Sequence, residues 1–195
     1  MLGHYRLSNE EKLPKKPLKQ GKGKKIHKPL DEFMNTRHKS EFPPLLQQGL
    51  HDLDEKSLKA LVVEKFPRST RREILWNNFV EIVGQLKSLK LPCKIWLDGS
   101  FLTEKIDPDD IDLVVDFPIQ VMLSLSPEQG DIIHKLSNCG FRHNQKLHTF
   151  VMFTAPAIHV EYVHHVAVHE QWKRDFRFSY IKREPKGIAV LEVRP

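Results

Sequence analysis

The spacing of apolar residues changes along the chain and predicts both helices and strands. Between residues 54 and 89 apolar residues recur every three or four positions, which is the period of an amphipathic helix. This spacing predicts a helix over 54–64 and a longer one over 70–89, separated by Phe66-Pro67, because proline interrupts a helix. Later stretches with the same period predict helices over 127–138 and 168–175.

Short apolar runs that follow residue 93 predict the strands. The expected strands cover residues 94–97, 110–117, 150–153, 158–163 and 187–193. Helices and strands mixed in this order favour an α+β (mixed α/β) domain, in which helices flank a small mixed β-sheet.

Charge divides the chain near residue 41. Residues 1–40 contain 11 Lys and Arg against 4 Asp and Glu, a net charge of +7, whereas the remaining 155 residues contain 20 and 21, a net charge of −1. Because proline and glycine accompany these lysines, we expect residues 1–41 to form a basic arm that is disordered or ordered only by a partner. Residues 42–195 would form the folded domain. The arm suits RNA, DNA or an acidic protein, and it equally suits a solvated tail.

Composition excludes several classes of protein. No apolar run approaches the roughly 18 residues that would indicate a membrane span. The first thirty residues lack the apolar core of a secretory signal. Cys93 and Cys139 are too few for a disulfide framework or a zinc site. We therefore expect a cytoplasmic protein that does not contact a membrane.

The chemistry of the chain is concentrated between residues 96 and 115. Gly99 and Ser100 close one apolar run, and Asp110 and Asp112 alternate with apolar residues at the start of the next predicted strand. Residues two apart in a strand share a face, so both carboxylates would point the same way. Like charges at close range repel each other, and a divalent cation makes such a pair favourable. Glycine admits close approach to a phosphate, and the Ser100 hydroxyl and nearby amides can donate hydrogen bonds to it.

A third carboxylate would complete such a metal site, and Glu161 is the candidate. It is the one acid in the predicted strand over 158–163, where an unpaired charge would be costly. The alternative is that Glu161 pairs with a Lys or Arg on the sheet surface. Magnesium accepts a few carboxylates and keeps several waters, so Asp110, Asp112 and Glu161 would suffice for a two-metal Mg²⁺ site, which Mn²⁺ could also occupy.

The order of these elements resembles the signature of the polymerase-β-like nucleotidyltransferase superfamily. That signature is an apolar strand end, Gly-Ser, a short interval and then Asp-x-Asp in a second strand. The resemblance implies that family's fold and places Gly99 and Ser100 on the phosphate and Asp110 and Asp112 on the metals. It puts Glu161 in the third acid position, which comes from a later strand. Many members have Gly-Gly-Ser, or Gly-Ser followed by a basic residue; here Asp98 precedes the pair and Phe101 follows it, and Lys105 is close enough to assist phosphate binding.

The chain looks similar to an uncharacterised bacterial branch of that superfamily over about residues 42–193. Its compact size resembles the minimal nucleotidyltransferases of toxin–antitoxin and phage-defence loci. The expected activity is transfer of an NMP from an NTP to an RNA end or a protein hydroxyl. The alternative function is a non-catalytic antitoxin or scaffold subunit that binds nucleic acid or a toxin or defence-complex partner through residues 1–41.

Other polar residues near the motif have simpler interpretations. Asp98 is expected to support the site from outside the metal ligands, and Asp116 to sit at a strand end. The adjacent His164 and His165 would point in opposite directions from a strand, which argues against a shared ligand role. A cluster before the long helix could meet a triphosphate or nucleic acid, or could be a solvated helix start; it consists of Arg68, Arg71 and Arg72.

Overall fold

The computed structural model describes residues 41–179 and 184–194. The chain divides into two units between Lys39 and Ser40. Residues 1–40 of the predicted basic arm lie outside the described residues. The second unit contains a five-stranded mixed sheet and four α-helices. The predicted α+β class, with a small mixed sheet flanked by helices, is therefore confirmed.

The sheet has the strand order β1-β5-β2-β3-β4, with parallel pairs at its two edges. The central strand β2 is antiparallel to both of its neighbours. The sequence did not predict β1, which has four mostly exposed residues and no regular alternation. The strands are β1 (Gly49–Asp52), β2 (Cys93–Asp98), β3 (Ile111–Pro118), β4 (Leu147–Thr154) and β5 (Gly187–Val193).

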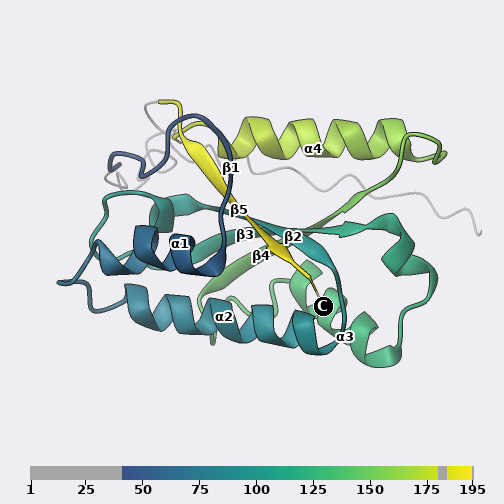
Figure 1. Ribbon diagram of the computed structural model, residues 1–195, viewed down its shortest axis with the longest axis horizontal. Helices are drawn as coiled ribbons and strands as arrows, with labels where there is room; N and C mark the ends of the chain where they lie inside the picture. The colour runs from purple at the N-terminus through teal and green to yellow at the C-terminus, as the bar shows by residue number, and fades with distance from the viewer. Residues whose placement is uncertain (1–40, 180–183, 195) are drawn as a thin grey trace, which may run out of the picture. The chain divides into compact units, whose positions relative to one another are not determined.

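The helices form one layer on each face of this sheet. In Figure 1, α1, α2 and α3 lie on one side of the strands and α4 lies alone on the other. No helix within the described residues is long and apolar enough to cross a membrane. The helices are α1 (Glu55–Lys59) with its π-helical continuation η2 (Ala60–Glu64), α2 (Arg72–Ser88), α3 (Pro127–Ser137) and α4 (Tyr162–Phe176); short 3₁₀ turns form η3 (Gly99–Leu102) and η4 (Ile119–Leu123).

Alternate residues of β2 supply two separate hydrophobic cores. Ile95 and Leu97 belong to the large core between the sheet and α1–α3, whereas Trp96 belongs to a smaller core with Phe176 of α4. The period of two along a strand produces this division. Even-numbered residues at the end of β2 and along β3 therefore face α4, on the side of the sheet that has the smaller core.

Arg72, the first residue of α2, is fully buried, and within the described residues its guanidinium forms no direct ion pair with a carboxylate. Instead its guanidinium lies over the Phe66 ring at 3.7 Å and donates to five backbone carbonyls at 2.7–3.3 Å. Burial lowers the pKa of Arg72 to about 10, so it stays charged at neutral pH. The accepting carbonyls belong to Val62, Phe101, Thr103, Lys105 and Ile106.

The proposed substrate-binding or solvated role of this arginine cluster is therefore wrong for Arg72. Its side chain anchors the loop that follows Gly99-Ser100 to the start of α2. The same helix start is capped by Ser69, whose hydroxyl accepts from the Arg72 N–H at 3.0 Å, and by Asp107, which accepts from the Thr70 N–H at 2.9 Å. The loop over residues 101–107 is thus held to the start of α2 in two ways: its carbonyls accept from Arg72, and its Asp107 side chain accepts from the Thr70 N–H.

Replacement of Arg72 by Met should lower the free energy of unfolding by about 3 kcal/mol or more, because several buried carbonyls lose their donors. Urea denaturation followed by circular dichroism measures the change. Arg68→Ala is the matched control: Arg68 is exposed, and its loss should cost no more than about 0.5 kcal/mol. Equal effects of the two substitutions would contradict the anchoring role of Arg72.

Candidate functional site

Asp98, Asp112 and His148 lie in one row across three neighbouring strands. Asp98 is the last residue of β2 and pairs in register with Asp112 of β3, which pairs in turn with His148 of β4. Residues directly opposite each other in adjacent strands project from the same face. All three side chains therefore point to the α4 side of the sheet, at the end where β2 stops and β3 starts.

Gly99 is required by the position of the Asp112 carboxylate. Its φ is +80°, a conformation that residues with a Cβ rarely adopt. A Cβ built on Gly99 would lie 2.2 Å from Asp112 Oδ2, well inside van der Waals contact. The motif glycine therefore makes room for an acid of the same motif, in addition to any approach of phosphate.

Asp98 forms a nearly buried ion pair with Lys186, the residue before β5. Lys186 Nζ lies 2.7 Å from Asp98 Oδ2, and the two side chains are 15% and 7% exposed. The other oxygen, Asp98 Oδ1, is buried and has no hydrogen-bond partner. Burial raises the pKa of Asp98 to about 6; the neighbouring Asp112 adds to the rise, and the Lys186 ammonium is the main group that opposes it.

His148 orients Asp112 from the other side. Its Nδ1 lies 3.1 Å from Asp112 Oδ1, and its ring packs on Phe150 with centroids 4.5 Å apart. Phe150 contacts Trp172 of α4 at 4.8 Å, so α4 supports the histidine through an aromatic chain. The sequence interpretation missed His148 because it began this strand at Phe150. The alternation of Leu147 and Thr149 with His148 was the available signal.

Asp110 lies one residue before β3 and is half-buried. It precedes Asp112 by two residues, as the motif requires. Ser100 lies within η3, half-buried, and its carbonyl accepts from the Thr103 hydroxyl at 2.8 Å. The structure thus brings Gly99 and Ser100 to the same end of the sheet as the two acids.

Lys105 is engaged by a neighbouring acid. Its Nζ lies 2.7 Å from Asp109 Oδ2, and the other carboxylate oxygen of Asp109 pairs with Arg71. A role for Lys105 at a phosphate would require this exposed pair to open, which costs little because such pairs contribute at most about 1 kcal/mol.

The strand predicted over 158–163, which was to carry Glu161, is wrong. Residues 158–161 form turns that lead into α4, Tyr162 and Val163 are its first two residues, and Glu161 is the exposed residue directly before the helix. Its backbone N–H donates to His159 Nδ1 at 3.2 Å. The alternating apolar residues that suggested a strand are in solvent: Ile158 is 96% and Val160 89% exposed.

Glu161 also lies at the wrong end of the sheet for the predicted site. α4 begins beyond the C-terminal end of β4, where His165 Nδ1 donates to the Phe153 carbonyl. Asp112 and His148 lie near the N-terminal ends of β3 and β4. Six residues of extended chain, roughly 20 Å, separate His148 from Thr154 at the other end of β4. The structure therefore does not bring Glu161 to Asp110 and Asp112.

The donors present at this end of the sheet suit a hard divalent cation. Carboxylate oxygens are the ligands that Mg²⁺ prefers, and one buried carboxylate oxygen here lacks any partner. Within residues 41–179 and 184–194, no three His, Cys, Asp or Glu side chains are already gathered around a single metal position. Two carboxylates and water molecules can nevertheless hold Mg²⁺, because it retains much of its hydration shell.

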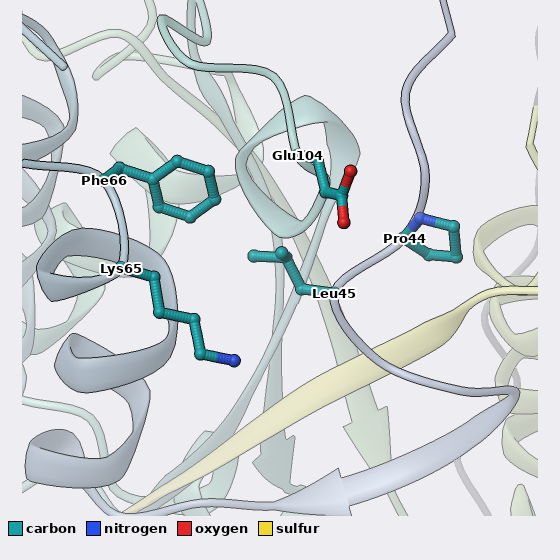
Figure 2. A pocket seen from close by; sticks show the side chains of 5 residues that line it. All are labelled: Pro44, Leu45, Lys65, Phe66 and Glu104. Atoms are coloured by element: carbon teal, nitrogen blue, oxygen red, sulfur yellow. The ribbon is translucent and has the colours of Figure 1, made fainter. Parts of the chain in front are cut away.

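An open hollow of about 440 Å³ lies apart from these acids (Figure 2). Glu104 and Lys65 approach it from different elements, with Phe66 at its side. Its lining contains none of the predicted site residues, so this hollow is separate from the site; the lining residues are Pro44, Leu45, Lys65, Phe66 and Glu104.

Comparison with known proteins assigns the chain to a family. The model of a family of unknown function, DUF6932, matches residues 39–192, nearly the whole of the second unit. The chain belongs to DUF6932. No curated protein and no solved structure matches it. The match begins at the division after Lys39, so the DUF6932 domain is the part of the chain that carries the sheet and its row of acids.

Gly99→Ala in this DUF6932 domain should lower the free energy of unfolding by about 2 kcal/mol or more, because the new methyl group meets Asp112 and the backbone is strained. Gly84→Ala is the matched control. Gly84 is exposed in α2 with nothing within 4 Å of a built Cβ, so alanine there should be neutral or stabilise by up to about 1 kcal/mol. Chemical denaturation of both variants measures their free energies of unfolding. Equal values for the two variants would refute the close contact of Gly99 with Asp112.

The raised pKa of Asp98 predicts a pH-dependent stability. The folded state holds this proton more tightly than the unfolded chain, so the stability that Asp98 contributes is complete below about pH 4 and is lost as the pH rises through about 6. Relative to Asp98→Asn, the wild-type free energy of unfolding should fall by about 3 kcal/mol between pH 4 and pH 7. Urea titrations of both proteins at several pH values measure it. Parallel pH profiles would show that Asp98 titrates normally.

Proposed function

We propose that this protein is a Mg²⁺-dependent nucleotidyltransferase that moves an NMP from an NTP to a hydroxyl on an RNA end or a protein side chain. The supporting observation is the seating of Asp112 against Gly99. The motif glycine and the motif acid contact each other across β2 and β3, and Asp110 precedes Asp112 by two residues. Residue spacing alone does not require this contact. Its presence supports interpreting Gly99-Ser100 and Asp110-Ile111-Asp112 as parts of one site.

The proposed assignment of roles follows from charge and position. Asp110 and Asp112 would hold the cation, with Mn²⁺ as an effective substitute for Mg²⁺. When bound, the cation would neutralise charge on the triphosphate and favour ionisation of the attacking hydroxyl. His148 would keep Asp112 in one orientation through its 3.1 Å contact.

The phosphate chain would lie against the turn that starts at Gly99. Ser100 and the backbone of η3 would supply hydrogen-bond donors there. Lys105, released from Asp109, would add a positive charge on the same loop. This loop is well suited to the task because Arg72 holds its backbone at Phe101, Thr103 and Lys105. A rigid cradle lowers the entropy lost when a flexible triphosphate binds.

The acceptor would be an RNA end or a protein hydroxyl, in keeping with a toxin–antitoxin or defence role. Residues 1–40, with a net charge of +7, would add salt-dependent affinity for an anionic acceptor. The rival function is a scaffold that uses this arm to bind nucleic acid or a partner protein and transfers nothing.

Full-length protein with Mg²⁺ and each α-labelled NTP should transfer label to total RNA or to a co-purified protein. Asp110→Asn and Asp112→Asn should each reduce this transfer at least about 100-fold, because both remove charge that the cation needs. Label at the γ-phosphate should not transfer, which separates NMP transfer from phosphoryl transfer.

Asp131→Asn is the control for that experiment, because Asp131 is an exposed acid of α3 on the other face of the sheet. It should retain full activity. Transfer that survives in the Asp110→Asn/Asp112→Asn double variant would refute the proposed mechanism. Arm-dependent complex formation without any label transfer would favour the scaffold.

A further inference from the structure

Asp98 has a carboxylate oxygen that nothing in the fold satisfies. Oδ2 receives the Lys186 ammonium at 2.7 Å, while Oδ1 is buried without a hydrogen-bond partner. Oδ1 is the one side-chain atom of this kind among the described residues. A buried carboxylate oxygen without a partner costs free energy, and such atoms in native proteins call for an explanation, often a bound ion or water.

The charge around Asp98 indicates which explanation applies. Asp98 faces Asp112 directly across the β2–β3 pair, and Asp110 lies two residues from Asp112. Asp98 and Asp112 thus face each other at one end of the sheet, and Lys186 pairs with Asp98. Two facing carboxylates, of which one is buried, are balanced by a cation more readily than by a neutral water molecule.

Asp116 provides a comparison on the same face of β3. It is also buried, but the Thr154 hydroxyl lies 2.8 and 2.7 Å from its two oxygens and His169 Nε2 lies 3.4 Å from Oδ2. Both oxygens of this buried aspartate therefore lie within hydrogen-bonding distance of a donor. Asp98 differs in that one oxygen is satisfied and the other is left over.

We propose that Asp98 is itself a ligand of the divalent cation, binding through Oδ1 together with the facing carboxylate of Asp112. This inference rests on the proposed function and replaces the ligand that Glu161 was expected to supply. Lys186 neutralises one oxygen of Asp98 and leaves the other for the cation. Since the three acids are not gathered around a metal position in advance, binding draws Asp110 toward the pair or leaves water in its place.

The position of Asp98 has a consequence for the motif. A ligand directly before Gly99-Ser100 places the cation against the turn that would hold the phosphates, so that metal and phosphate sites share one segment of backbone. Lys186 and the cation would then compete for Asp98, because both are attracted to the same carboxylate. Removal of the lysine should therefore strengthen cation binding.

Titration of the full chain with Mn²⁺ alone, with free Mn²⁺ measured by its electron paramagnetic resonance signal, tests the proposal without any substrate. Asp98→Asn should weaken binding at least tenfold. Asp116→Asn is the matched control: it removes a buried carboxylate from the same face, about 13 Å along the strand from Asp112, and should leave affinity unchanged. Equal affinity of Asp98→Asn and wild type would overturn the proposal.

Lys186→Met provides a second and opposite test, which holds even if Asp98→Asn folds poorly. It should bind Mn²⁺ several-fold more tightly than wild type, and Mn²⁺ should raise its melting temperature more. An affinity that is unchanged or lower would count against Asp98 as a ligand. Asp112→Asn distinguishes the metal site from the role of Asp98: if Asp112→Asn weakens Mn²⁺ binding and Asp98→Asn does not, the metal site stands and only the role of Asp98 fails. If neither variant binds Mn²⁺ more weakly than wild type, the metal site of the proposed function fails as well.

Discussion

The buried guanidinium of Arg72 is the constraint on which the site depends. A cation in the interior must be compensated, and here backbone carbonyls from Val62 and from the loop after Gly99 accept its hydrogen bonds, while the Asp107 carboxylate adds a favourable charge interaction. The same contacts determine the path of the chain between β2 and β3. Because that path ends at Asp110, it supports the register in which Asp98 faces Asp112. Arg72 of α2, on one face of the sheet, therefore helps to position acids that point to α4 on the other face.

The two faces of the sheet have different tasks. The face toward α1–α3 carries the large hydrophobic core, which supplies most of the apolar burial. The face toward α4 combines a small core around Trp96 and Phe176 with a row of titratable groups. With a single helix over this face, Asp110 and Asp112 at its end are half-buried, and a charged ligand can reach them at lower desolvation cost than in the main core.

Much of the fold could be predicted from local patterns. The helical period over 70–89 and the apolar runs at 94–97 and 110–117 correspond to α2, β2 and β3. The pattern predicts these three elements correctly because their regularly spaced apolar residues all pack into a hydrophobic core. The region 158–163 fails for the opposite reason: its apolar residues alternate but contact nothing, so no packing converts the alternation into a strand. The β1 strand lacks a pattern and exists because β5 offers it a parallel edge.

The sequence was sufficient to predict the α+β class and to locate Gly99, Ser100, Asp110 and Asp112 as neighbours, because they lie within a short stretch joined by one turn. Only the tertiary structure revealed that His148 orients Asp112, that Lys186 pairs with Asp98, and that Asp98 keeps an unsatisfied oxygen. These partners lie 36 to 88 residues apart. Such contacts follow from strand register and from the order of strands in the sheet, which no local pattern of residues encodes.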